Sequence, residues 1–128
     1  MKPLPENVIA SRVLDKAFII HRELGPGLLE SVYEKCLAHE LTESGHDVKI
    51  QVPVPLVYKT IRFEAGFRID LLIDGKVLLE IKSVENLAPV HFSQTVTYLK
   101  LTGIKLGLLI NFNVSLLKEG IHRLVNKL

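Results

Sequence analysis

The stretch Arg68-Ile-Asp-Leu-Leu-Ile-Asp-Gly-Lys-Val-Leu-Leu-Glu-Ile-Lys82 decides the fold of this chain. Two runs of mostly apolar residues flank Asp74-Gly75, a dipeptide typical of β-hairpin turns. We therefore expect two antiparallel strands, 68–73 and 76–82. The charged residues of the stretch make this hairpin the first place to look for chemistry.

The register of the hairpin decides which side chains share a face of the sheet. A two-residue turn would place Glu80 and Lys82 among aliphatic side chains. We expect instead a three-residue loop, Ile73 to Gly75, with Gly75 at positive φ and Leu72 paired with Lys76. One face then carries Ile69, Leu71, Val77, Leu79 and Ile81, and the other carries Asp70, Leu72, Lys76, Leu78, Glu80 and Lys82.

The segments around the hairpin predict helices and further strands. The apolar spacing indicates a helix from about residue 5 to Leu24, broken by Gly25-Pro-Gly27, and a second from Leu28 to Gly45. The order continues with antiparallel strands from Val48, a helix from Pro89 to Gly103, a buried strand 104–112 and a short amphipathic helix, Ser115 to Lys127. Two helices, four or five antiparallel strands, a helix, a strand and a helix predict an α+β (mixed α/β) fold with a mixed sheet.

Composition limits the classes of protein to which the chain can belong. With 128 residues, 48% of them hydrophobic and 23% charged, we expect one domain spanning residues 1–128. No apolar run approaches the roughly 20 residues of a membrane span, so we expect no membrane partner. The lack of a secretory pattern and the single cysteine, Cys36, favour the cytoplasm. A net charge of +2 is too small to indicate nucleic acid by itself.

Three charged side chains converge on one face of the expected hairpin. Asp70 and Glu80 are carboxylates on adjacent strands, and Lys82 follows Glu80 by two residues. Two rigid oxygen ligands with open positions suit Mg²⁺ or Mn²⁺, whereas the histidine-poor set disfavours zinc. The structural alternative is an ordinary salt bridge of Lys82 with either acid on a solvated strand.

Polar residues on the predicted helices extend this set. Glu30 and Glu34 are one turn apart, so both could approach a metal, although we expect Glu34 in solvent. A purely structural Glu30 would complement the helix dipole. Gln94 and Tyr98 are also one turn apart, and we expect their stripe to open toward Glu80.

Two further residues have open roles. His91 lies one turn before Gln94 and extends the same polar stripe toward the start of the helix. Such groups could hydrogen-bond a phosphate or hold the carboxylates. Tyr33 either touches a substrate or is buried and hydrogen-bonded, and Tyr98 could alternatively cover the core with its hydroxyl in water.

These residues resemble the motifs of a known nuclease family. Asp70 followed by Glu80-Ile81-Lys82 resembles the D…E-x-K signature of the PD-(D/E)XK nuclease superfamily, although Ile69 replaces the usual preceding proline. The run Gly27-Leu-Leu-Glu-Ser-Val-Tyr33 resembles the GxxExxY motif that names a small family within it. Gln94-Thr-Val-Thr-Tyr98 is similar to the Q-x-x-x-Y helix motif of RecB-type members, and 109–112 resembles the closing strand.

The resemblance implies a restriction-endonuclease-like core, in which helices flank a central mixed sheet with an antiparallel meander. It implies metal-dependent hydrolysis of phosphodiester bonds in nucleic acid, with DNA expected, by a water that Mg²⁺ (or Mn²⁺) activates. Asp70, Glu80 and Glu30 would then bind the metal, and Lys82 would activate or orient the water. Gln94, Tyr98, Tyr33 and His91 would contact substrate or support these ligands.

Other functions stay open at this level. The same fold could serve as a non-catalytic module that binds nucleic acid or protein, or as a small hydrolase or structural subunit of a larger complex. A nuclease of 14 kDa could also grip a duplex as a homodimer.

Overall fold

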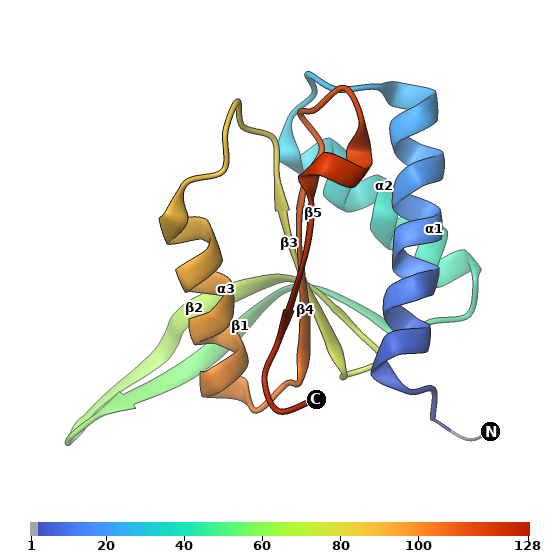
Figure 1. Ribbon diagram of the computed structural model, residues 1–128. Coiled ribbons are helices and arrows are strands. Elements are labelled where there is room, and N and C mark those ends of the chain that lie inside the picture. Colours follow the sequence, from blue (N-terminus) through green and yellow to red (C-terminus); the bar gives the residue numbers. More distant parts are fainter. Residues whose placement is uncertain (1–2) are drawn as a thin grey trace.

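The computed structural model describes residues 3–128 and contains a mixed sheet of five strands with helices on both faces (Figure 1). The elements are, in chain order, α1 (Glu6–Leu24), α2 (Glu30–Glu43), β1 (Val48–Tyr58), β2 (Ile61–Ile73), β3 (Val77–Lys82), α3 (Pro89–Thr102), β4 (Leu106–Asn111), the 3₁₀ helix η1 (Leu117–Gly120) and β5 (Ile121–Val125). The strand order is β1-β2-β3-β4-β5; β3 and β4 are parallel, and all other neighbours are antiparallel. The α+β fold with a mixed sheet is thus confirmed.

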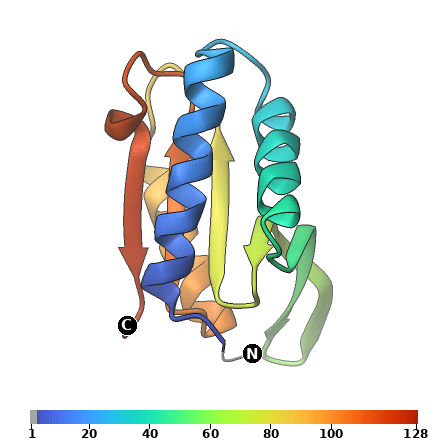
Figure 2. The same ribbon diagram turned by 90° about the vertical axis from the view of Figure 1, so that its right-hand side faces the viewer.

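The helices form one layer on each side of the sheet. α1 and α2 lie side by side over one face (Figure 2), and α3 covers the other. The larger core, under α1 and α2, includes Val13 and Leu79, and the smaller one, under α3, contains Ile69, Leu78 and Leu99. None of the helices within residues 3–128 is long and apolar enough to cross a membrane.

The junction between α1 and α2 is closed by a buried tyrosine. α1 ends at Leu24 as predicted, because Gly25 takes a left-handed φ of 72°. The Tyr33 hydroxyl donates to the Gly25 carbonyl at 2.6 Å and accepts from the Leu28 N–H at 3.1 Å, and its ring stacks on Phe112. Tyr33 is 0% exposed, so it shapes the loop into α2 and has no surface with which to touch a substrate.

The hairpin between β2 and β3 has a three-residue loop, as predicted, but the loop begins one residue later. Ile73 pairs with Val77, so the loop comprises residues 74–76, and the predicted pairing of Leu72 with Lys76 is wrong. The error in register is two residues. Because this is an even number, the faces assigned to the β3 side chains are unchanged.

The backbone of the turn explains the shift. Asp74 (φ 52°) and Gly75 (φ 65°) both adopt left-handed conformations, and the Lys76 N–H donates to the Ile73 carbonyl at 3.0 Å. Lys76 then leaves the ladder, and its Nζ donates to the Leu4 carbonyl at 3.0 Å beside α1. It therefore does not lie on the face that its sequence position predicted.

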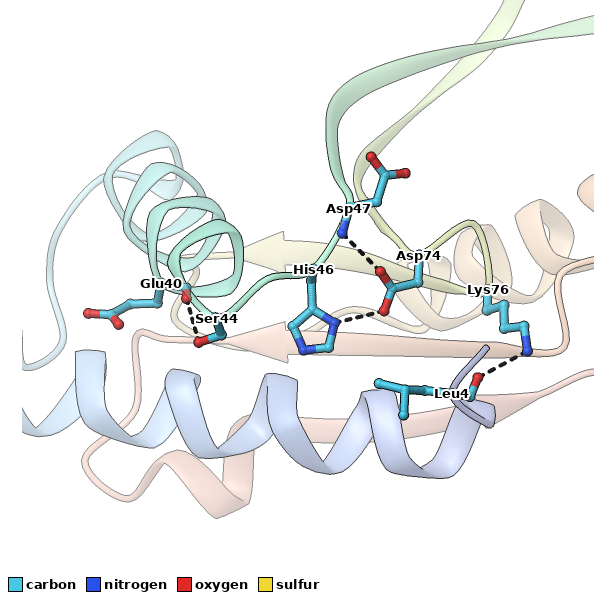
Figure 3. Close-up of polar contacts among 7 residues, drawn as sticks. All are labelled: Leu4, Glu40, Ser44, His46, Asp47, Asp74 and Lys76. Atoms are coloured by element: carbon cyan, nitrogen blue, oxygen red, sulfur yellow. Dashed lines mark hydrogen bonds and ion pairs between the residues drawn. The ribbon is translucent and has the colours of Figure 1, made fainter. Parts of the chain in front are cut away.

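The turn is also tied to the connection between α2 and β1, as Figure 3 shows. Asp74 Oδ2 lies 2.7 Å from Nδ1 of the buried His46, and Asp74 Oδ1 accepts from the Asp47 N–H at 2.9 Å. The Asp74 N–H donates in turn to the Asp47 carbonyl at 2.8 Å. These contacts fix the end of the sheet where β1 begins and β2 ends.

β2 does not keep one face toward one layer along its whole length. Leu71 and Ile73 pack in the core under α1 and α2, but Ile69 packs under α3, contrary to the expected sharing of a face. The change occurs at Asp70, opposite Gln51 of β1, whose φ of 50° is left-handed. Beyond this point β1 and β2 continue as a two-stranded arm that extends past α3 (Figure 1).

Three antiparallel strands, rather than the expected four or five, follow α2. Residues 48–58 and 61–73 each form one long strand, with an irregular register between Val54 and Leu56. Pro53 and Pro55 are tolerated because β1 is an edge strand, where a missing N–H does not break the sheet. The segments that we expected to be separate strands are therefore parts of two continuous strands, β1 and β2.

The C-terminal segment is not the helix predicted for Ser115 to Lys127. It forms η1 and then β5, which pairs antiparallel with β4. Successive β5 side chains face opposite layers: the His122 ring meets Phe92 of α3, and the Arg123 guanidinium donates to Asn7 of α1 at 2.6 Å. Pairing with β4 overrides the helix-like apolar spacing of this short segment.

We expect the substitution Tyr33→Phe to lower the free energy of unfolding by roughly 1–3 kcal/mol, because the Gly25 carbonyl and the Leu28 N–H lose their part-buried hydrogen-bond partner. Chemical denaturation measures this change. Tyr58→Phe is the matched control, since Tyr58 is 59% exposed, and it should leave stability unchanged. Equal effects of the two substitutions would contradict the structural role of the Tyr33 hydroxyl.

Candidate functional site

The candidate site lies where β2 separates from β3. The ladder between these strands extends from the Ile73–Val77 pair to the Leu71–Leu79 pair. One residue further along, the Ile81 N–H donates to the side chain of Asp70, at 2.8 Å from Oδ2. A carboxylate thus takes the place of a main-chain acceptor in the sheet, and the strands diverge at this point.

Glu80 lies in this divergence, opposite Asp70 in the continued register. It is 5% exposed, and its Oε1 has no hydrogen-bond partner. Burial, and then the negative charge of Asp70, raise the pKa of Glu80 to about 9, although the charge of Lys82 acts in the opposite direction. A buried acid in this state lacks a positive partner.

Lys82 ends β3 two residues after Glu80. It is half-buried and forms no ion pair with Asp70 or Glu80, so the simple salt bridge is not what the structure contains. The chain after Lys82 is held by Asn111 of β4, which donates to the Val84 carbonyl at 2.9 Å and accepts from its N–H at 3.1 Å. Sequence reasoning did not single out Asn111; its only signal was a polar residue ending an apolar strand.

The two glutamates of α2 have different surroundings. Glu34 is half-buried rather than solvated, and both of its oxygens accept from Gln51 Nε2 at 3.1 Å. The same nitrogen donates to Asp70 Oδ1 at 3.3 Å. Burial raises the pKa of Glu34, and the charges of Asp70 and Glu30 act in the same direction, against the hydrogen bond from Gln51.

Glu30 is exposed at the start of α2. Its Oε2 accepts from the Ser83 N–H at 3.3 Å, and the Ser83 hydroxyl donates to the Leu28 carbonyl at 2.6 Å. Glu30 therefore connects α2 to the residue that directly follows Lys82. The structure places it beside the end of β3, with its carboxylate already engaged.

Tyr98 of α3 approaches the site from the other layer. Tyr98 is half-buried and stacks on Phe67 of the arm, with ring centroids 4.1 Å apart. Burial raises the pKa of Tyr98, and the charges of Glu80 and Asp70 contribute, so its phenol lies near these acids. Gln94 precedes it by one helical turn, as predicted, and is exposed.

His91 has a local structural contact at the start of the same helix. Its Nδ1 accepts from the Ala88 N–H at 3.0 Å, which satisfies one backbone donor before α3. The His91 N–H donates to the Ala88 carbonyl at 2.9 Å. The ring thus stabilises the N-terminus of the helix that carries Gln94 and Tyr98.

The donor chemistry fits a hard divalent cation. Asp70 lies opposite Glu80, whose buried Oε1 has no hydrogen-bond partner, and carboxylate oxygens are the ligands that such a cation prefers. Within residues 3–128, no three His, Cys, Asp or Glu side chains are already gathered as a metal-binding group.

Comparison with known proteins identifies the family of the chain. Neither the curated proteins nor the solved structures give a match. A family model for the PD-(D/E)XK nuclease superfamily matches residues 7–124, a range that contains the whole site and all five strands except the last residue of β5. The mixed five-stranded sheet flanked by helices is consistent with the restriction-endonuclease-like fold. On these grounds the chain belongs to the PD-(D/E)XK nuclease superfamily.

Proposed function

We propose that this chain is a metal-dependent nuclease that hydrolyses phosphodiester bonds of DNA, with Mg²⁺ or Mn²⁺ as its cation. The observation that carries the proposal is the buried Glu80 carboxylate, unpartnered at Oε1 and adjacent to Asp70. The proposal includes membership of the GxxExxY family, a single nuclease-like domain over residues 1–128 and a cytoplasmic location. Superfamily membership supports the nuclease-like activity.

Each site residue then has a role. Asp70 and Glu80 hold the cation together with one glutamate of α2, for which the GxxExxY motif names Glu30. The bound cation lowers the pKa of water and neutralises charge on the phosphate. The Lys82 ammonium, at the end of β3, forms no ion pair with Asp70 or Glu80, and it orients the attacking water or a phosphate oxygen.

Residues of α3 complete the proposed site from the opposite layer. The Tyr98 phenol faces the acids and donates a hydrogen bond to a phosphate oxygen or to a carboxylate. Gln94, exposed one turn earlier, contacts the substrate strand. The roles of His91 and Tyr33 are indirect, because their polar groups hold the start of α3 and the loop before α2.

One observation favours a second candidate, a non-catalytic module that binds nucleic acid or protein. The described residues bring together no complete three-ligand group, and Glu30 is engaged with Ser83. In such a module the acids would be remnants of the motif and would bind no cation. Cation dependence of cleavage separates the two candidates.

The purified chain should cleave plasmid DNA in millimolar Mg²⁺ or Mn²⁺ and not in EDTA, as gel electrophoresis reports. Lys82→Ala and Glu80→Gln should each reduce the rate by roughly 10²-fold or more, because each removes a group that acts on the reacting phosphate or its cation. Glu64→Gln, on the exposed arm, is the control. Cleavage of RNA but not of DNA would change the proposed substrate from DNA to RNA. No cleavage of either polymer would support the non-catalytic module.

Stability should fall as pH rises, because Glu80 resists ionisation in the folded state. The pKa of Glu80 is about 9 in the folded chain and about 4.5 ordinarily. Between these pH values the folded chain binds one proton more than the unfolded chain, so the free energy of unfolding falls as the pH rises from 4.5 to 9. Glu80→Gln should remove this loss and raise the free energy of unfolding at pH 8 by roughly 1–3 kcal/mol. Urea denaturation of both proteins at pH 5 and pH 8 measures it; a constant difference at both pH values would refute the prediction.

Millimolar Mg²⁺ should raise the melting temperature of the wild type through preferential binding to the folded state. Asp70→Asn should keep the apo stability, since an amide oxygen can still accept from the Ile81 N–H, but it should lose the Mg²⁺ effect. Asp70→Ala should lose both, with roughly 1–3 kcal/mol of destabilisation from the unpaired N–H. If these carboxylates served only as salt-bridge partners, each substitution would lower the stability of the apo protein, and Mg²⁺ would not change the melting temperature of the wild type or of any variant.

A further inference from the structure

Gln51 has a strained backbone at the centre of the site. Its φ of 50° lies in the left-handed region, which is unfavourable for a residue that carries a side chain. The neighbouring residues are held in the ladder, since Ile50 pairs with Leu71 and Val52 pairs with Ile69. The paired residues on both sides of Gln51 hold its backbone in this conformation.

The strain places one amide nitrogen between two carboxylates. Gln51 Nε2 donates to both oxygens of Glu34 at 3.1 Å and to Asp70 Oδ1 at 3.3 Å. Each of these acids would repel the other without a donor between them. The amide therefore holds a helix carboxylate of α2 against the strand carboxylate that faces Glu80.

An independent observation beside Asp70 is a buried carboxylate oxygen without a hydrogen-bond partner. Glu80 is 5% exposed, lies opposite Asp70, and has a buried Oε1 without a partner. Glu30, by contrast, is exposed and accepts from the Ser83 N–H at 3.3 Å. The α2 acid that shares a hydrogen-bond donor with Asp70, the neighbour of Glu80, is thus Glu34.

We propose that Gln51 is a positioning residue that holds Glu34 against Asp70, and that Glu34, rather than Glu30, supplies the α2 carboxylate of the cation site. This inference rests on the cation site of the proposed function and specifies its third ligand. Glu30 then serves to fix the end of β3 through Ser83. Gln51 acts through the two carboxylates and does not touch the reacting atoms.

The test measures Mn²⁺ binding by water-proton relaxation, with Mg²⁺ as competitor, for Glu34→Gln and its matched control Glu30→Gln on the same helix. We expect Glu34→Gln to weaken Mn²⁺ at least about tenfold and Glu30→Gln by less than about threefold. Gln51→Gly and Gln51→Asn tolerate the left-handed backbone but remove or shorten the amide. Both should weaken Mn²⁺ by roughly 10–100-fold. The free energy of unfolding of the apo protein should not fall, because relief of the left-handed strain offsets the loss of the amide's exposed hydrogen bonds.

The outcomes separate this inference from the proposed nuclease activity. Loss of Mn²⁺ binding in Glu30→Gln but not in Glu34→Gln, or unchanged affinity in both Gln51 variants, overturns the inference even if DNA is cleaved. If the Mn²⁺ affinities follow the expected pattern but no DNA is cleaved, the result supports the inference about Glu34 and Gln51 and contradicts the proposed nuclease activity. A wild type that binds no Mn²⁺ overturns the inference together with the cation site.

Discussion

The hydrogen bond from the Ile81 N–H to the Asp70 carboxylate is the contact on which the site depends. At 2.8 Å it replaces the backbone partner that β3 loses when β2 turns away. An unpaired, partly buried N–H would cost roughly 1–3 kcal/mol, so the divergence of the strands is stable only with an acceptor at position 70. The same side chain thereby faces Glu80, so the carboxylate that supports the sheet is also one of the proposed cation ligands.

The divergence also determines how the two layers meet. Because β2 leaves β3 at Asp70, the arm can pass over α3, and Phe67 stacks on Tyr98. Ile69 then joins the core under α3 while Leu71 stays under α1 and α2. The site thus lies at the point where the sheet transfers its apolar side chains from one layer to the other.

Much of this arrangement is readable from local patterns. Helical spacing and the Gly25-Pro-Gly27 break predicted the first two helices, and Gly103, with a φ of 75°, ends α3 as expected. The faces of Glu80 and Lys82 follow from the period of a strand, which an even register error leaves intact. Such features depend on residues close together in sequence.

The parts that could not be predicted depend on distant contacts. β5 reads as an amphipathic helix, and only pairing with β4 makes it a strand. The left-handed φ of Gln51 has no local signal, since glutamine carries no preference for it. Glu34 resembles any solvated helix acid until β1 brings an amide to it, so its position could not be inferred from α2 alone.

The buried acid and the strained strand are two parts of one arrangement. Ionisation of Glu80 is costly because its carboxyl group is buried next to Asp70. The free energy gained by burying the apolar side chains of β3 and β4 offsets this cost. The left-handed φ of Gln51 lets β1 and β2 cross to the α3 layer, and it also directs the Gln51 amide at Glu34 and Asp70. A straight strand at this position would lose both effects, because the backbone that redirects the arm is the backbone that aims the amide.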